Sequence, residues 1–370
     1  MNETSLYERY HRQTILPGFG EEGQQKLLRG KVCVVGAGGL GCPVLQYLTA
    51  AGVGTLGIVD DDLVALSNLH RQVLYSVNDI GRSKVETATE ILRQLNTEIR
   101  IIPYNERITT QNALTLFELF DIIIDGTDNF TTRYMINDAC VLLKKPLVFG
   151  AVSRFEGQVS VFINQNDDDV NYRDMFPDPP KEDEIPNCAE AGVLGVLPGI
   201  VGTMMANETI KMITGIGESL ANQLLTYNSL TNQVHQFNLP AKKETRSRLP
   251  KSRSEFLNTD YEWLCSSSGS NDEIDVKTFN ILLEQGNVDV IDVRESDELP
   301  RANEFPNIKI PMAQLTSSQD AITSASVVVF CQTGSRSLQA AKILKNIFGE
   351  NKKIYSLRGG ILEWKSVIRQ

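Results

Sequence analysis

The sequence predicts an α/β protein with two domains, for three reasons. The chain has 370 residues, which is more than the roughly 50–250 residues of a typical domain. In both halves, short apolar segments rich in β-branched residues alternate with helical segments, a pattern typical of parallel sheets that are covered by helices. Between the halves, residues 241–273 are first basic and then rich in serine, which is typical of a linker.

The first predicted domain, residues 1–240, contains a sheet of near-continuous apolar strands. Strands of this kind that alternate with helices pair in parallel, whereas a short spacing between two strands is typical of a hairpin. We therefore expect a mixed sheet. The expected elements are strands at 31–37, 55–61, 98–104, 121–128, 147–153 and 157–163, helices at 40–51, 83–95 and 200–214, and alternating segments within 223–239.

The second predicted domain, residues 274–370, is a smaller α/β unit. Three apolar segments, DVIDVR at 289–294, SVVVFC at 326–331 and KIYSL at 353–357, are predicted strands. A helix is expected at 336–347, between the last two strands. The order of these elements again favours a parallel sheet.

The composition excludes several classes of protein. Hydrophobic residues make up 41% of the chain and charged residues 22%, as in ordinary globular proteins, and the net charge of −10 argues against a nucleic-acid partner. No apolar run approaches the roughly 20 residues of a membrane span, so we expect a cytoplasmic protein that binds no membrane. The six cysteines form no C-x-x-C pair and there are three histidines, so we expect no zinc site.

A glycine-rich turn lies between the first predicted strand, at 31–37, and the first predicted helix, at 40–51. Gly36, Gly38, Gly39 and Gly41 allow the backbone to approach a phosphate and to offer N–H groups at a helix N-terminus. Asp60 ends the next strand, where a carboxylate typically accepts hydrogen bonds from a ribose. Both features fit ATP as well as NAD, so an NAD-dependent oxidoreductase remains an alternative at this point.

Cationic and polar residues after the second strand favour nucleotidyl transfer over hydride transfer. Asn68, Arg71 and Lys84 lie within a short span that can fold back over the glycine turn. Positive charge at this place would stabilise a departing pyrophosphate, although single lysines and arginines are usually solvated surface charges. Asp128, at the end of a later strand, is either a ligand of the Mg²⁺ that accompanies ATP or a cap of the following helix.

Several motifs occur in an order that resembles the MoeB/ThiF family, the ubiquitin-activating-type adenylyltransferases of sulfur-carrier pathways. They are RYHRQ at 9–13, GAGGLG at 36–41, the strand end at Asp60, LSNLHRQ at 66–72, the segment around Lys84, and GTDN at 126–129. The resemblance covers about residues 5–239. It implies a Rossmann-like ATP-binding domain that adenylates the C-terminal Gly-Gly carboxylate of a small ubiquitin-like sulfur carrier.

The resemblance also implies roles for individual residues. Arg12 matches an arginine that reaches into the nucleotide site of a partner subunit, which implies a homodimer. Many members carry a zinc-binding CYRC segment where this chain has Asn171, Tyr172, Arg173 and Asp174, and the second cysteine pair is absent too. We therefore expect packing alone to hold this region. The residues implied to hold ATP and Mg²⁺ are Gly39, Asp60, Asn68, Arg71, Lys84 and Asp128.

The cysteines differ in their surroundings. Cys33, Cys42 and Cys140 lie in apolar patterns and are expected in the core, and nothing supports a function for Cys265 in the linker. Cys188 follows an acidic, proline-rich segment, and its spacing leaves open whether it is an inert loop thiol or a nucleophile. The segment PNCAEAG resembles the catalytic-cysteine segment of the family, which implies a nucleophilic role for Cys188.

Cys331 ends a strand and opens a loop that leads into a helix. Backbone N–H groups of such a loop, together with the guanidinium of Arg336, are expected to stabilise a thiolate. IDVRE at 291–295, CQTGSRS at 331–337 and RGGILEW at 358–364 resemble a rhodanese domain, in which this cysteine carries a persulfide. The usual His-Ile-Pro-Gly-Ala segment survives only as IKIPMA at 308–313.

Together these features predict a chain that adenylates a sulfur carrier and then transfers sulfur from a Cys331 persulfide to give a thiocarboxylate. Cys188 then either resolves the linkage to Cys331 or first accepts the acyl group as a thioester. The carrier, in a molybdopterin, thiamine or related pathway, and the sulfur donor, a cysteine desulfurase or thiosulfate, stay open. A carrier-conjugating scaffold with an inert rhodanese tail is a further alternative.

Overall fold

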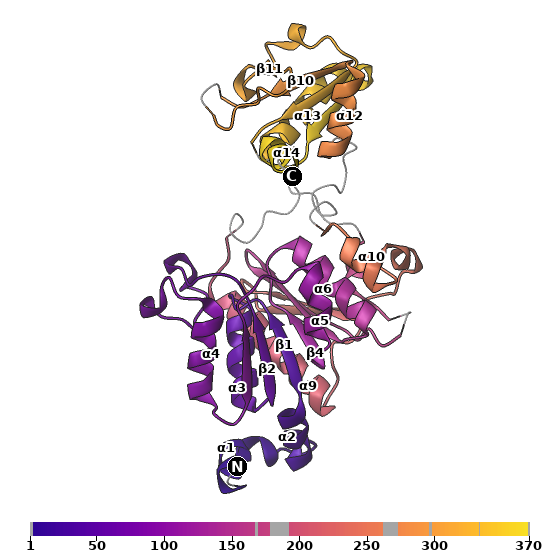
Figure 1. The fold of residues 1–370 in the computed structure, drawn as a ribbon. Coiled ribbons are helices and arrows are strands. Elements are labelled where there is room, and N and C mark those ends of the chain that lie inside the picture. The colour runs from indigo at the N-terminus through magenta and orange to yellow at the C-terminus, as the bar shows by residue number, and fades with distance from the viewer. Residues whose placement is uncertain are drawn as a thin grey trace. The chain divides into compact units, whose positions relative to one another are not determined.

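The structure is a computed structural model that describes residues 3–166, 169–177, 192–261, 273–295, 298–332 and 334–368. The chain divides into two compact units, Met1–Ser268 and Gly269–Gln370 (Figure 1). Both units are α/β, so the predicted fold class is confirmed. Among the described residues, no helix combines the length and the apolar character needed to cross a lipid bilayer.

The first unit contains one mixed sheet of eight strands in the order β3-β2-β1-β4-β5-β6-β7-β8. The first five strands in this order are parallel, and β6, β7 and β8 continue the sheet in antiparallel fashion. The order 3-2-1-4-5 is that of dinucleotide-binding folds, in which ligands bind at the carboxyl ends of the strands. The strands are β1 (Lys31–Val35), β2 (Thr55–Val59), β3 (Arg100–Tyr104), β4 (Ile122–Asp125), β5 (Leu147–Ser153), β6 (Glu156–Phe162), β7 (Gln223–Asn228) and β8 (Gln233–Asn238).

Helices cover both faces of this sheet because the central strands are apolar on both sides. In β1, Val32 and Val34 pack into one core with α2, α3, α4 and α9, whereas Cys33 and Val35 pack into a second core with α5 and α6 (Figure 1). The α-helices of this unit are α1 (Glu3–Thr14), α2 (Gly20–Arg29), α3 (Gly41–Ala51), α4 (Lys84–Leu95), α5 (Thr110–Phe117), α6 (Phe130–Leu143), α7 (Tyr172–Met175), α9 (Val196–Thr214) and α10 (Arg253–Asn258).

Part of the expected linker packs on the first unit. Residues 243–258 form the 3-10 helix η3 (Lys243–Arg248) and α10. Thr245 is buried, and Phe256 and Tyr261 join the core that contains α5 and α6. The remaining linker residues, 262–272, lie outside the described part of the chain.

The second unit contains a parallel sheet of five strands in the order β11-β10-β12-β13-β9. One face packs against α13 through a core that includes Cys331, and the other face packs against α12 and α14 around Phe305 and Trp364. The elements are β9 (Glu273–Ile274), α12 (Val276–Gln285), β10 (Val288–Asp292), β11 (Ile308–Lys309), β12 (Ser326–Phe330), α13 (Ser335–Phe348), β13 (Lys353–Leu357) and α14 (Gly360–Ile368).

Candidate active site

The glycine turn between β1 and α3 has a shape that only glycine permits at two positions. Gly36 has a φ of +94°, and a Cβ there would lie 2.8 Å from the carbonyl oxygen of Gly126. A Cβ on Gly41 would lie 1.9 Å from the carbonyl oxygen of Gly36. The backbone of the turn therefore approaches itself closely at Gly41. Gly36, Gly38 and Gly39 line the wall of a cleft of about 490 Å³.

This cleft gathers most of the residues that the sequence singled out in the first unit. Asp60, Asn68, Arg71, Lys84 and Asp128 all line it, although they come from different segments of the chain. Arg12 does not line the cleft of its own chain and is exposed on α1. Described lining residues that the sequence reasoning missed include Asp61, Asp62, Glu106, Arg107, Ile108, Asn129, Thr132 and Arg133. Most of them lie in the loops that follow β2, β3 and β4, and this position after a strand was the signal available in the sequence.

Asp60 ties the glycine turn to the end of β2. Its two carboxylate oxygens accept hydrogen bonds from the N–H groups of Ala37, at 2.7 Å, and Asp62, at 2.8 Å. Burial raises the pKa of the Asp60 carboxyl above its usual value, while the ammonium of Lys84 and these two N–H donors act in the opposite direction. A carboxylate held in this way keeps lone pairs free for the hydroxyls of a ribose.

Two cations approach the glycine turn from the segment after β2. The Lys84 side chain is only 5% exposed and its ammonium lies 2.6 Å from the carboxylate of Asp62. Arg71 Cδ lies 3.6 Å from the position that a Cβ on Gly39 would occupy, so the side chain lies over the turn. Tyr75 fixes the segment by donating its hydroxyl to the carbonyl of Ala37 at 2.9 Å. Positive charge thus lies beside backbone that can bind phosphate.

Asp128 follows β4 and is exposed on the cleft wall. The cap of α6 is Asn129, whose side chain accepts a hydrogen bond from the N–H of Thr132 at 2.9 Å. The alternative that Asp128 caps this helix is therefore wrong, and its carboxylate is available to a ligand. Arg133 supports the same turn by donating to the carbonyl of Thr127 at 2.8 Å.

The cleft fits a nucleotide together with a divalent cation. Gly36, Gly38 and Gly39 bring the backbone to the cleft wall, Arg71 and Lys84 supply positive charge, and Asp128 supplies the oxygen ligand that Mg²⁺ prefers. The side-chain oxygens of Asp60, Asp61 and Asp62 also lie within 4.8 Å of one another. Asp60 and Asp62 are already engaged with backbone N–H groups and Lys84, respectively.

Three cysteines belong to the core, as predicted, and two lie outside the described residues. Cys33, Cys42 and Cys140 are buried free thiols, and burial raises the pKa of the Cys42 thiol to about 12. They cannot form a thiolate readily at neutral pH. Cys188 and Cys265 fall outside the described part of the chain.

Cys331 lies at the end of β12, directly before α13, and is 1% exposed. Its Sγ accepts a hydrogen bond from the N–H of Gly334 at 3.1 Å, and the hydroxyl of Ser337 lies 3.6 Å from it. Gly334 has a φ of +100°, which bends the loop so that this N–H faces the sulfur. Ser337 is held in turn by the hydroxyl of Ser356, at 2.9 Å.

Arg336 lies close enough to Cys331 for a Coulombic interaction, as expected, but its guanidinium is paired directly with a carboxylate. Its two terminal nitrogens each lie 2.6 Å from one carboxylate oxygen of Glu298. This bidentate pairing with Arg336 lowers the pKa of the Glu298 carboxyl to about 2. The positive charge of Arg336 beside the cysteine loop is therefore balanced by the negative charge of Glu298. Sequence reasoning missed Glu298, Ser337 and Ser356 as partners of the loop.

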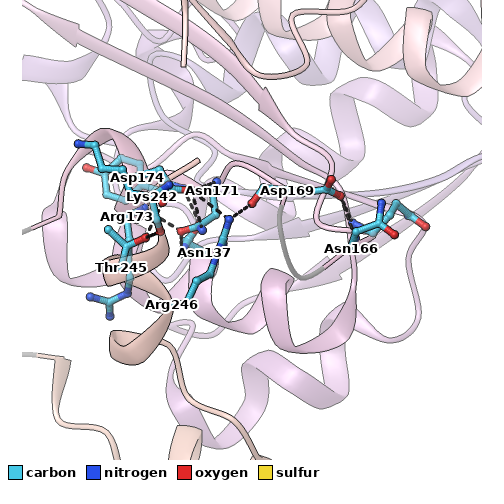
Figure 2. A network of polar contacts seen from close by, with 11 residues as sticks. Asn137, Asn166, Asp169, Asn171, Arg173, Asp174, Lys242, Thr245 and Arg246 are labelled. Atoms are coloured by element: carbon cyan, nitrogen blue, oxygen red, sulfur yellow. Dashed lines mark hydrogen bonds and ion pairs between the residues drawn. The ribbon is translucent and has the colours of Figure 1, made fainter. Parts of the chain in front are cut away.

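The region that corresponds to the zinc segment is held by hydrogen bonds and an ion pair. Arg173 and Asp138 form a bidentate pair with distances of 2.8 and 2.7 Å. The hydroxyl of Thr245 donates to the carboxylate of Asp174 at 2.5 Å (Figure 2). The expectation that packing alone holds this region is therefore wrong. The physical reason is that the side chains at these positions are polar and buried, so each requires a partner.

The fold and these two sites define a nucleotide-binding α/β enzyme with a second unit that presents a buried, hydrogen-bonded cysteine. The ThiF family model matches residues 10–249, and the model of the rhodanese-like domain matches residues 275–367. The chain belongs to the ThiF family and carries a C-terminal rhodanese-like domain. It is an adenylyltransferase and sulfurtransferase that uses ATP, and the sequence resemblance is confirmed.

Two relatives that are named as both adenylyltransferase and sulfurtransferase cover nearly the whole chain, and one named as an adenylyltransferase covers 60% of it. The probable adenylyltransferase/sulfurtransferase MoeZ of Mycobacterium tuberculosis is 40% identical over 96% of this chain and 92% of its own length. The adenylyltransferase and sulfurtransferase MOCS3 of Xenopus laevis is 36% identical over 96% of this chain and 85% of its own. The sulfur carrier protein adenylyltransferase of Thermus thermophilus is 53% identical over 60% of this chain and 83% of its own.

Solved structures agree on the fold of the first unit. A crystal structure of Escherichia coli MccB superposes with a TM-score of 0.56 at 23% identity, covering 64% of this chain and 73% of that one. At this identity the likeness concerns the fold alone.

Proposed function

We propose that this enzyme adenylates the C-terminal carboxylate of a small ubiquitin-like sulfur carrier that ends in Gly-Gly, and then converts the adenylate into a thiocarboxylate. One observation carries the proposal. The same chain holds a cleft with a glycine turn, two cations and an exposed carboxylate, and a second unit in which a cysteine sulfur accepts an N–H at the start of a helix. The family and the names of the relatives support both activities.

In the first step, an oxygen of the carrier's carboxylate attacks the α-phosphorus of ATP, and pyrophosphate leaves. The N–H groups of the glycine turn bind phosphate, Asp60 orients the ribose, and Arg71 and Lys84 stabilise the charge that develops on pyrophosphate. Asn68 provides a further polar contact on the same wall. Asp128 would hold Mg²⁺, which neutralises phosphate charge when it is bound.

In the second step, the terminal sulfur of a persulfide on Cys331 attacks the acyl carbon, and AMP leaves. The product is an acyl disulfide between the carrier and Cys331. The N–H of Gly334 bonds to Sγ of Cys331 and stabilises its thiolate, the form that takes up sulfur from the donor to give the persulfide. Release of the thiocarboxylate requires a second thiolate, and we assign it to Cys188, which attacks the Cys331 sulfur and forms a disulfide. The alternative order, in which Cys188 first accepts the acyl group as a thioester, gives the same product.

The remaining features of the proposal concern assembly and location. Arg12 is exposed on α1 and does not line its own cleft, which supports a homodimer in which it reaches the nucleotide site of the partner subunit. Cys33, Cys42 and Cys140 are buried free thiols, which agrees with a reducing compartment, and we place the enzyme in the cytoplasm. We assign residues 1–240 to the adenylyltransferase domain and 274–370 to the sulfurtransferase domain.

The proposal is tested with candidate carriers from the same cell. Each carrier is incubated with the enzyme, ATP, Mg²⁺ and either thiosulfate or a cysteine desulfurase with cysteine. Mass spectrometry then detects replacement of oxygen by sulfur at the carrier terminus, which identifies the pathway and the donor together. Exchange of labelled pyrophosphate into ATP in the presence of the carrier reports the first step alone. Absence of exchange with every Gly-Gly carrier contradicts the proposal.

The Cys331→Ala variant separates sulfur transfer from the scaffold alternative. We expect normal pyrophosphate exchange and no donor-dependent thiocarboxylate, because the variant lacks the persulfide thiol. Unchanged thiocarboxylate formation would favour a carrier-conjugating scaffold with an inert second unit. Binding of NADH in preference to ATP would favour the oxidoreductase that the glycine turn alone left open.

A further inference from the structure

Two arginines lie close to the cysteine loop of the second unit, and each forms a two-point ion pair. Arg336, in the first turn of α13, places its two terminal nitrogens 2.6 Å from the two carboxylate oxygens of Glu298. Arg294, which follows β10, places Nε and Nη2 2.8 Å from the two oxygens of Asp292. Each carboxylate thus occupies two of the N–H groups with which an arginine binds an oxyanion.

Further hydrogen bonds hold Glu298 in this position. Its Oε1 also accepts the N–H of Glu295 at 2.9 Å, and the carbonyl of Leu299 accepts a hydrogen bond from the side chain of Gln332 at 3.2 Å. Pairing with Arg336 lowers the pKa of the Glu298 carboxyl to about 2, so this carboxylate is ionised throughout the physiological pH range. A negative charge is therefore fixed beside the loop that begins with the catalytic cysteine.

These paired charges influence which sulfur donors can approach the loop. Arg336 interacts electrostatically with both Cys331 and Asp292, and Arg294 interacts with Glu298. The two arginines and the two carboxylates balance, so these five groups carry one negative charge when Cys331 is a thiolate. Thiosulfate is a dianion, and its approach to a thiolate requires positive charge that is not already balanced. A persulfide on a thiol carries at most one negative charge and is repelled less.

We propose that Glu298 is a specificity-determining residue of the second unit. Its carboxylate occupies the N–H groups of Arg336 that an anionic donor would use, and thereby selects a thiol-bound persulfide over free thiosulfate as the sulfur donor. In the selected reaction, the Cys331 thiolate attacks the outer sulfur of a donor R–S–SH. The bond between the two donor sulfurs breaks, R–S⁻ leaves, and the outer sulfur keeps its proton. The inference rests on the proposed function and names the class of donor that serves its second step.

The test measures how fast the full-length enzyme forms a persulfide on Cys331, a step that needs neither ATP nor a carrier. Peptide mapping by mass spectrometry detects one added sulfur atom at this residue. The donors are thiosulfate and a cysteine desulfurase with cysteine, and the readout is the ratio of the two loading rates. Glu298→Gln removes the negative charge and keeps the shape of the side chain. We expect this ratio to rise about tenfold in favour of thiosulfate, because the charge of Arg336 is then no longer balanced.

Three controls separate an effect of charge from a change of structure. Benzenethiosulfonate contains the same kind of sulfur–sulfur bond as thiosulfate but has a single negative charge, so Glu298→Gln should accelerate its reaction less. Glu304→Gln removes another paired carboxylate, whose partner Lys365 lies in α14 on the face of the sheet opposite α13, and should leave the ratio unchanged. In the double variant Glu298→Gln/Arg336→Met, the ratio should return to the wild-type value.

Three results would overturn the inference. The first is an unchanged ratio of thiosulfate loading to desulfurase loading in Glu298→Gln. The second is an equal acceleration of thiosulfate and benzenethiosulfonate, since the effect would then not depend on the charge of the donor. The third is an equal rise of the ratio in Glu304→Gln. Absence of a persulfide on Cys331 of the wild type with every donor would instead contradict the proposed function.

Discussion

The buried ion pair between Arg173 and Asp138 gives the sharpest stability prediction. Arg173 is 2% exposed and Asp138 0%, measured on the side chains, and the guanidinium lies 5.0 Å from the ring centroid of Tyr134. Asp138 also accepts the hydroxyl of Tyr261 at 2.9 Å. Arg173→Met keeps most of the volume but leaves a carboxylate buried without its cation. Breaking one partner of such a pair costs about 3–5 kcal/mol.

This cost is measurable as a shift of the unfolding transition of the first unit. A loss of about 3–5 kcal/mol corresponds to a decrease in Tm of roughly 6–20 °C for a unit of this size. The assay is thermal unfolding of the full chain, followed by near-ultraviolet circular dichroism, with the two units analysed as separate transitions. Arg82→Met is the control, because Arg82 pairs with Glu90 at the surface, with side chains 44% and 58% exposed, and such pairs contribute less than about 1 kcal/mol.

A second variant tests the cause of the loss. Asp138→Asn in the Arg173→Met background removes the uncompensated charge but keeps an oxygen that can accept the hydroxyl of Tyr261. The double variant should therefore be more stable than Arg173→Met alone. Two results would contradict this reasoning. One is a Tm of Arg173→Met no lower than that of Arg82→Met, and the other is a double variant less stable than Arg173→Met alone.

Three further predictions concern the glycine turn, the metal ligand and the cysteine loop. Gly41→Ala should abolish pyrophosphate exchange, because its Cβ would lie 1.9 Å from a carbonyl oxygen, whereas Gly199→Ala, with open space around it, should keep it. Asp128→Asn should lower exchange by at least about 100-fold at unchanged Tm, and Asn129→Ala should lose about 1 kcal/mol of stability because it removes the helix cap. Glu298→Gln should be less stable than the wild type at neutral pH. Because pairing lowers the pKa of Glu298 from 4.5 to about 2, this difference should shrink as pH falls through that interval in thermal unfolding of the second unit.

The main strands were predictable from the sequence because they are buried on both faces. The predicted strand at 147–153 coincides with β5, and the predicted strand at 353–357 coincides with β13. Continuous apolar runs of this kind carry a local signal. Residues 243–261 carry no such local signal, because their composition is basic and polar. Phe256 in this stretch is buried only through contacts with distant parts of the chain. Such packing depends on partners that local patterns do not reveal.

The candidate site was predictable to the extent that it follows strand ends. Asp60 and Asp128 follow β2 and β4, and the parallel order brings these ends to one cleft. Glu298 was not predictable as the partner of Arg336, because the two residues are separated by 38 positions and pair through loop geometry. The sequence left open whether Asp128 binds a metal ion or caps α6. Only the structure shows that the side chain of Asn129 caps this helix.

Burial alone does not distinguish the candidate nucleophile among the described cysteines, because Cys33, Cys42, Cys140 and Cys331 are all buried. The direction of the hydrogen bond at the sulfur distinguishes Cys331 from Cys42. The Sγ of Cys42 donates to the carbonyl of Ala37 at 3.5 Å, an arrangement that requires the proton to stay on sulfur. The Sγ of Cys331 accepts the N–H of Gly334, an arrangement that favours negative charge on sulfur. A cysteine sulfur that accepts an N–H in this way suits the nucleophile that we propose, because attack requires negative charge on sulfur.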